Sequence, residues 1–130
     1  MNKYRDKSDF EINKAVAEKV GIIRHLYLAE FLGEVIWDVT SNDNYNGFIS
    51  KKGLAFDPCN NPADAMPIVF ENKISLHAPR FNEGWMAEYT GSDDDVNDGF
   101  QVDYYESHNK NPLRAAMEVF LMMKDAENES

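Results

Sequence analysis

Short polar side chains gather in one block of the chain, Phe56 to Asp64, which reads Phe-Asp-Pro-Cys-Asn-Asn-Pro-Ala-Asp. Carboxylate and amide groups can hydrogen-bond a small ligand or a peptide backbone. The same groups also bond local backbone and thereby build turns. The block matches no catalytic signature, so two interpretations stay open, a structural turn and a ligand-binding turn. The candidate ligand-binding residues are Asp57, Cys59, Asn60, Asn61 and Asp64.

A run of carboxylates at residues 93–99 has part of the pattern of a calcium-binding loop, since Asp93, Asp95 and Asn97 would take its first, third and fifth positions. The glycine of that loop comes one residue late, however, and Tyr104 stands where a bidentate glutamate is needed. We therefore predict a solvated hairpin turn here and no metal site.

Cys59 is the single cysteine, which rules out an internal disulfide and fits a reducing cytoplasm. Paired with His77 or His108, its thiol would be a candidate nucleophile. No spacing in the sequence brings these groups together, and a small half-buried side chain is the alternative interpretation. The sequence predicts no catalytic residue and no cofactor, and it favours a non-enzymatic role.

Acidic and aromatic residues alternate late in the chain. Residues 83–106 hold eight acidic residues and no basic one. Such a surface can attract a basic protein over long range, as a mimic of nucleic acid does, or it can be a solvated sheet face. The interaction residues predicted in this stretch are Trp85, Tyr89, Asp93, Asp94, Asp95, Tyr104 and Tyr105.

Two helices are marked by their start signals. Ser8 and Glu11 form a capping box ahead of a helix predicted at residues 9–20. Asn111-Pro112 starts a second helix, predicted at residues 112–124. The apolar stripe of the second helix is unusually wide. Its extra members face either a second packing layer or a partner, and they are Val119, Met122 and Met123.

Pro67 constrains a third helix. With Asp64 as the cap, Pro67 falls in the first turn, where its missing amide costs nothing, so we predict a turn at 57–63 and a helix near 65–72. Three strands are expected to follow as an antiparallel meander with one buried side, and Tyr104 is assigned to that side. The strands are predicted at residues 73–78, 85–89 and 100–106. Residues 35–39 form another predicted strand, 22–31 fit a strand or a helix, and 46–49 carry a hairpin signal.

Taken together, these elements predict one α+β domain over residues 1–130, with frayed ends at 1–7 and 125–130. Its antiparallel sheet would have about four to six strands, with helices packed mainly on one face. Apolar residues make up 43% of the chain, but no run approaches the roughly 18 residues of a membrane span, so no membrane association is expected. The net charge of −10 opposes binding to nucleic acid.

Three blocks of the chain together resemble the NinX-like proteins of lambdoid phages and prophages. They are residues 8–17, residues 56–64 with Pro67-Ile68, and residues 111–123. One departure is Met66, where the family pattern has tryptophan. The resemblance implies a cytoplasmic accessory protein of a phage-infected bacterium and brings no catalytic residues with it. We expect it to bind a host or phage protein; a small enzyme or ligand-binding domain built on the Asp57–Asp64 turn is the alternative. The sequence sets no oligomeric state.

Overall fold

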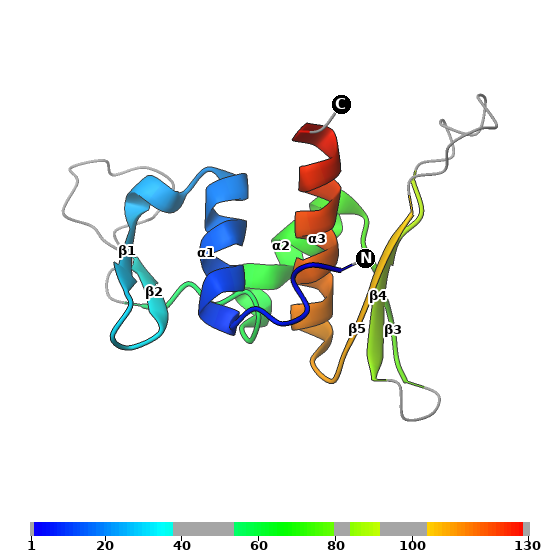
Figure 1. Cartoon of the computed structure of the whole chain (residues 1–130), viewed down its shortest axis with the longest axis horizontal. Coiled ribbons are helices and arrows are strands. Elements are labelled where there is room, and N and C mark those ends of the chain that lie inside the picture. The colour runs from blue at the N-terminus through cyan, green and yellow to red at the C-terminus, as the bar shows by residue number, and fades with distance from the viewer. Residues whose placement is uncertain (1, 38–53, 80–83, 92–103, 129–130) are drawn as a thin grey trace.

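Three α-helices lie between two small antiparallel sheets in the computed structural model, which describes residues 2–37, 54–79, 84–91 and 104–128 (Figure 1). The elements are α1 (Asp9–Val20), the 3-10 helix η1 (Ile23–His25), β1 (Leu26–Ala29), β2 (Glu34–Trp37), α2 (Pro62–Asn72), β3 (Ser75–His77), β4 (Trp85–Tyr89), β5 (Tyr105–Asn109) and α3 (Pro112–Asn128). None of the helices in these ranges combines the length and apolarity that crossing a membrane requires.

Every described strand pair is antiparallel. β1 pairs with β2, and an isolated bridge from Ile36 to Ala55 adds a short third segment beside them. The second sheet has the order β3-β4-β5. The predicted α+β fold with antiparallel strands and helices packed against them is thus confirmed, with the strands divided between two sheets.

The core surrounds α3, which contacts α1 and α2 as well as β4 and β5. Because these elements cover α3 on several sides, its apolar stripe is unusually wide. Val119 is fully buried, so it belongs to the core and does not form a partner-facing surface. Met122 and Met123 are half-buried and pack against the same core.

The capping box of α1 forms as predicted. The Glu11 amide donates to Ser8 Oγ at 3.1 Å, and the Ser8 amide donates to Glu11 Oε1 at 3.3 Å. Gly21 ends the helix in the left-handed conformation, at a φ of 91°. Each of these signals acts within one helical turn, which is why the sequence alone located them.

The predicted start of α2 is wrong. The helix begins at Pro62, Asn61 caps it by accepting the Ala63 amide at 3.0 Å, and Pro67 lies inside the helix. Asp64 is not the cap, because its carboxylate accepts the amide of Asp57 at 2.9 Å. A pre-set proline at the first helical position and a well-placed cap together outweigh the backbone hydrogen bond lost at Pro67.

The inward face of β5 also differs from the prediction. β5 spans Tyr105–Asn109 and not residues 100–106, of which 100–103 lie outside the described residues. Its register places Ser107 opposite the buried Ala87, so the odd-numbered residues face α3. Tyr104, assigned to the buried side, is instead 46% exposed.

The remaining predicted segments lie partly inside and partly outside the described residues. The ambiguous stretch 22–31 forms η1 followed by β1, and the strand predicted at 35–39 is described as β2. Residues 38–53, with the predicted hairpin signal, lie outside the described residues. Residues 2–7 and 125–128, where the sequence predicts frayed ends, carry side-chain contacts described below.

Candidate functional site

The turn at residues 57–61 is held together by its own polar groups. The Asp57 carbonyl accepts the amides of Asn60 and Asn61 at 3.0 and 2.7 Å. The Asp57 carboxylate accepts both of its intraturn hydrogen bonds from Asn60 Nδ2, at 3.2 and 3.1 Å. The Asp57 amide is bound in turn by Asp64. The polar groups predicted as ligand contacts therefore bind one another.

The same turn joins α1 to α3. Asn13, buried in α1, donates to Asp57 Oδ1 at 2.9 Å and accepts the Cys59 amide at 3.2 Å. Asn111, which precedes α3, donates to the Cys59 carbonyl at 2.6 Å and to Asn60 Oδ1 at 3.0 Å. The three sequence blocks that carry the family resemblance meet at this point, and the contacts they make are those of a structural joint.

The Cys59 side chain is fully buried, and its Sγ lies 3.9 Å from the Asp9 carbonyl oxygen. Burial, followed by the nearby Asp9 carboxylate, raises the pKa of the Cys59 thiol well above its ordinary range. His77 and His108, the partners considered for it, lie exposed on strands of the β3–β5 sheet. A neutral, enclosed thiol is a poor nucleophile.

A second network, next to the turn, is charged. Arg114 is buried in the first turn of α3, and its Nε donates to Glu118 Oε2 at 2.6 Å. Its Nη1 donates to Asp9 Oδ1, also at 2.6 Å. Its Nη2 donates to the carbonyl oxygens of Tyr4 and Lys7 at 2.9 and 2.6 Å. One guanidinium thus fixes the N-terminal segment and α1 to α3.

Glu118 completes this network on the side of the sheet. The residue is 1% exposed, and its Oε1 accepts from Ser107 Oγ on β5 at 2.5 Å and from Asn2 Nδ2 at 2.6 Å. The last turn of α3 also contacts the N-terminal segment, since Asp125 accepts a hydrogen bond from the Tyr4 hydroxyl. Within the described residues, no buried side-chain nitrogen or oxygen lacks a partner, so the network is satisfied without a ligand.

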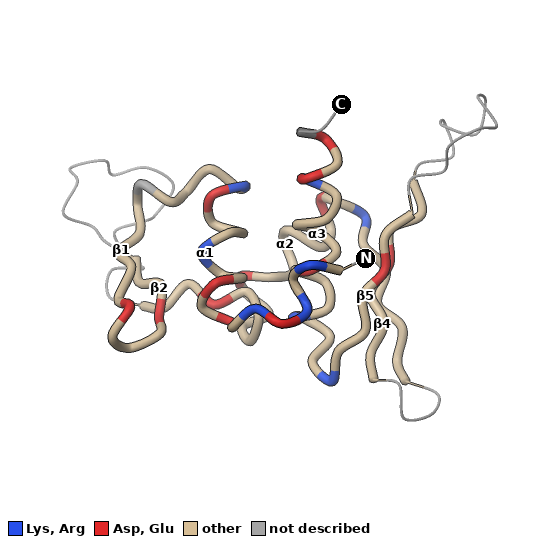
Figure 2. Tube along the Cα trace, in the orientation of Figure 1, with Lys and Arg blue, Asp and Glu red and all other residues tan. Residues whose placement is uncertain are grey.

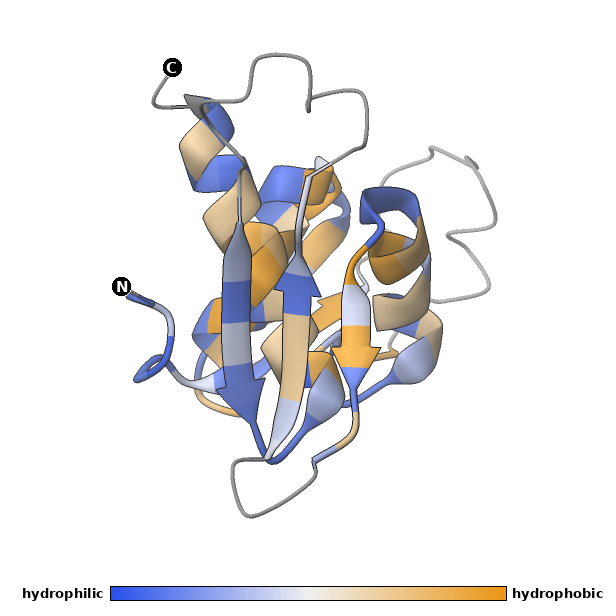
Figure 3. Ribbon diagram, turned by 90° about the vertical axis from the view of Figure 1, so that its right-hand side faces the viewer, coloured by the Kyte–Doolittle hydropathy of each residue, from blue (hydrophilic) through white to orange (hydrophobic). Residues whose placement is uncertain are grey.

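The outer face of the β3–β5 sheet, which points away from the helices, is a different kind of surface (Figure 3). Glu88 on β4 and Glu106 on β5 stand directly opposite each other. The hydroxyl of Tyr104 lies 3.0 Å from a carboxylate oxygen of each. Partial desolvation of the hydroxyl and these two hydrogen bonds raise the pKa of Tyr104 to about 12.

Two imidazoles flank the carboxylates. His77 Nε2 lies 2.8 Å from Glu88 Oε1, and His108 Nε2 lies 3.6 Å from Glu106 Oε2. Strands β3, β4 and β5 contain no lysine or arginine, and acidic positions are marked on this sheet in Figure 2. Within the described chain no cluster of His, Cys, Asp or Glu is arranged to hold a metal ion. The residues on this side of the sheet form the outer sheet face, which consists of His77, Met86, Glu88, Tyr104, Glu106 and His108.

The predicted interaction residues do not share one surface. Tyr104 lies on the outer sheet face, whereas Tyr89 and Tyr105 are half-buried on the inner side and stack with ring centroids 6.5 Å apart. Trp85 is half-buried on β4, in the same alternation as the buried Ala87. Of the remaining members, Met122 and Met123 pack against the core from α3, and Asp93, Asp94 and Asp95 lie outside the described residues.

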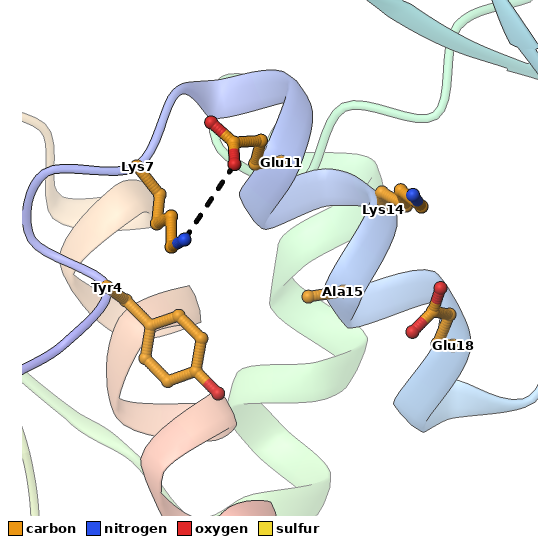
Figure 4. Close-up of a pocket in the computed structure, with 6 residues that line it drawn as sticks. All are labelled: Tyr4, Lys7, Glu11, Lys14, Ala15 and Glu18. Atoms are coloured by element: carbon orange, nitrogen blue, oxygen red, sulfur yellow. Dashed lines mark ion pairs between the residues drawn. The ribbon is translucent and has the colours of Figure 1, made fainter.

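A pocket of about 260 Å³ opens between the N-terminal segment and α1 (Figure 4). Its lining consists of Tyr4, Lys7, Glu11, Lys14, Ala15 and Glu18. Basic and acidic groups alternate there, and Lys7 Nζ lies 3.9 Å from Glu11 Oε2. None of these residues comes from the Asp57–Asp64 turn, which was the basis of the ligand-binding alternative.

A protein-family model described as "Bacteriophage P22, NinX" matches residues 3–124 of the 130. The chain belongs to this NinX family. The expected resemblance is therefore confirmed over nearly the whole length and not only in its three blocks. No curated protein and no solved structure matches the chain significantly.

Two buried charged residues of this NinX-family chain, Arg114 and Glu118, were missed by sequence reasoning. A signal for them exists, because residues four apart on a helix lie on one face, where a basic and an acidic side chain can pair. The two residues sit inside an apolar stripe, which indicates a buried pair. The exposed Phe31 and Leu32 were also missed, since Phe31 ends the stretch 22–31, where helix and strand patterns overlap, and Leu32 follows it directly.

Proposed function

We propose that this NinX-family chain acts in the bacterial cytoplasm by binding a host or phage protein through the outer sheet face. The observation that carries the proposal is the direct cross-strand opposition of Glu88 and Glu106. Like charges placed opposite each other on neighbouring strands destabilise a sheet. An arrangement that is locally unfavourable in the free protein is typical of a functional surface.

A cation supplied by a partner would remove this repulsion. The Tyr104 hydroxyl has one proton to share between two carboxylates, so one carboxylate always lacks this donor. A lysine or arginine of the partner can pair with both carboxylates and can also lie against the exposed Tyr104 ring. The net charge of −10 would speed encounter with such a basic surface and make binding sensitive to salt.

The enzyme or small-ligand alternative has less support. The polar groups of the Asp57–Asp64 turn are bonded to one another and to α1 and α3, and the described pocket lies elsewhere. A binding surface needs no such pocket, since aromatic and charged side chains on a sheet face are sufficient for protein recognition.

The test is affinity capture from phage-infected bacteria, followed by binding measurements with the purified captured protein. The double variant Glu88→Gln/Glu106→Gln removes two charges from the outer sheet face. Its control, Asp6→Asn/Glu71→Gln, removes two exposed charges elsewhere. We expect the first variant to bind roughly tenfold more weakly and the control to bind nearly as wild type. Equal affinity of both variants and wild type would reject the outer sheet face as the binding surface.

A further inference from the structure

The turn that joins β1 to β2 presents two large apolar side chains to water. Phe31 is 80% exposed and Leu32 is 56% exposed. Short turns are ordinarily filled by Gly, Asn, Asp, Ser or Pro, which suit their backbone and solvation. Only Gly33, at a φ of 67°, follows this rule here. The apolar pair therefore goes against the usual chemistry of a turn.

The turn has a defined backbone. The Leu32 amide donates to the Ala29 carbonyl at 3.0 Å, and the Gly33 amide donates to the Glu30 carbonyl at 3.1 Å. The flanking strands are paired up to Ala29 and Glu34. A turn with a defined backbone restricts where the Phe31 ring can lie, which lowers the entropy that a contact at this point must overcome.

The turn lies at the opposite end of the molecule from the outer sheet face, with the helices between them (Figure 1). Exposed Glu30 and Glu34 flank Phe31 and Leu32, as the acidic positions on either side of this turn show in Figure 2. We propose that this turn is a second docking site, whose occupant is a partner protein offering an apolar pocket edged by lysine or arginine. It is separate from the outer sheet face and does not depend on it.

Charge complementarity decides among the possible occupants. A second copy of the chain would bring the same glutamates together, and the described pocket is lined mainly by Lys7, Glu11, Lys14 and Glu18, which do not suit a phenylalanine. An anionic lipid surface would be repelled by the same two glutamates. An apolar pocket with a basic edge accepts the aromatic side chain and pairs with the carboxylates.

Phe70 on α2 provides a matched control, because it is another phenylalanine with comparable exposure, 72%. A photo-crosslinking phenylalanine analogue is placed at position 31 or at position 70 of the full chain in phage-infected bacteria. We expect position 31 to form an adduct with one discrete protein and position 70 not to form it. An adduct with another copy of the chain, an adduct with lipid, no adduct, or the same adduct from both positions would overturn the proposal.

The partner protein identified by the crosslink is then purified without the crosslink, and its affinity for variants of the chain is measured. Phe31→Ala should weaken affinity by roughly tenfold or more, whereas Phe70→Ala should leave it unchanged, and both variants should unfold as wild type because neither ring is buried. The charge-reversal variant Glu30→Lys/Glu34→Lys should also bind more weakly than wild type. Added salt should weaken the binding of the wild-type chain. If neither the charge reversal nor added salt changes the affinity, the partner has no basic edge at this site, and the proposed occupant is overturned. Glu88→Gln/Glu106→Gln separates this site from the proposed function, because that variant should leave the crosslink at position 31 intact.

Discussion

Cys59 illustrates how the surroundings of one residue decide its chemistry. Its burial, reinforced by the Asp9 carboxylate, raises the thiol pKa. We expect 5,5′-dithiobis(2-nitrobenzoic acid) to react very slowly with Cys59 in the native protein at pH 8 and rapidly once denaturant is added, because the thiolate is the reactive species. Rapid reaction in the native state would contradict the description of a neutral, enclosed thiol.

The same pKa shift gives a pH dependence with a definite sign. Above roughly pH 8.5 a cysteine in the unfolded chain releases its proton, whereas buried Cys59 retains it. The unfolded state then binds fewer protons than the native state, so the free energy of unfolding should fall as pH rises through this range. Urea unfolding at pH 7.5 and pH 9.5, with Cys59→Ala as the control, measures the contribution. An equal fall in the control would assign the effect to other groups.

Asn61 is the residue that should be changed to test the start of α2. Replacing it with alanine removes the acceptor of the Ala63 amide and should lower the free energy of unfolding by about 1 kcal/mol. Glu71→Ala, an exposed change in the same helix, should have little effect. Equal unfolding midpoints for the two variants in urea would show that Asn61 is not the cap.

At the scale of elements, Arg114 and Glu118 determine how the N-terminal segment, α1, α3 and β5 fit together. Changing Arg114 to methionine leaves Glu118 buried without its counter-ion, and we expect a loss of about 3–5 kcal/mol in unfolding free energy. The double variant Arg114→Met/Glu118→Leu should be more stable than Arg114→Met, because it removes the unpaired charge. Urea denaturation measures both. A double variant no more stable than the single one would show that the buried carboxylate is not the source of the loss.

Elements whose signals are local could be predicted from the sequence, and those set by distant contacts could not. The capping box of α1 and the Asn111-Pro112 start of α3 lie within a few residues of the helices they begin. By contrast, which residues of β5 point toward the core is determined by its register against β4. β4 and β5 are separated in the sequence by residues 92–103 and their neighbours, so no local signal sets this register. A shift of one residue in that register moves Tyr104 from one face of the sheet to the other, which is how its predicted and observed sides differ.

At the scale of the whole molecule, a helical centre separates two unlike surfaces. One end carries the outer sheet face with its opposed carboxylates, and the other carries the apolar turn at Phe31 and Leu32 (Figure 1). The acidic and aromatic composition of residues 83–106 is visible in the sequence, but the opposition of Glu88 and Glu106 is not, because it depends on the register of β4 against β5. The sequence could not place the apolar turn, because exposure of Phe31 depends on where β1 ends and how the turn leaves the core.

We propose that the outer sheet face serves the binding of a basic partner and not the stability of the fold, and Glu106→Gln separates these two roles. Two quantities are measured on the same preparation, the free energy of unfolding in urea and the dissociation constant for the captured partner. Because the change removes repulsion from Glu88, we predict stability equal to wild type or higher by about 0.5 kcal/mol, together with affinity weakened several-fold or more. A variant that is less stable than wild type yet binds its partner as tightly would assign Glu106 to the stability of the fold and not to binding.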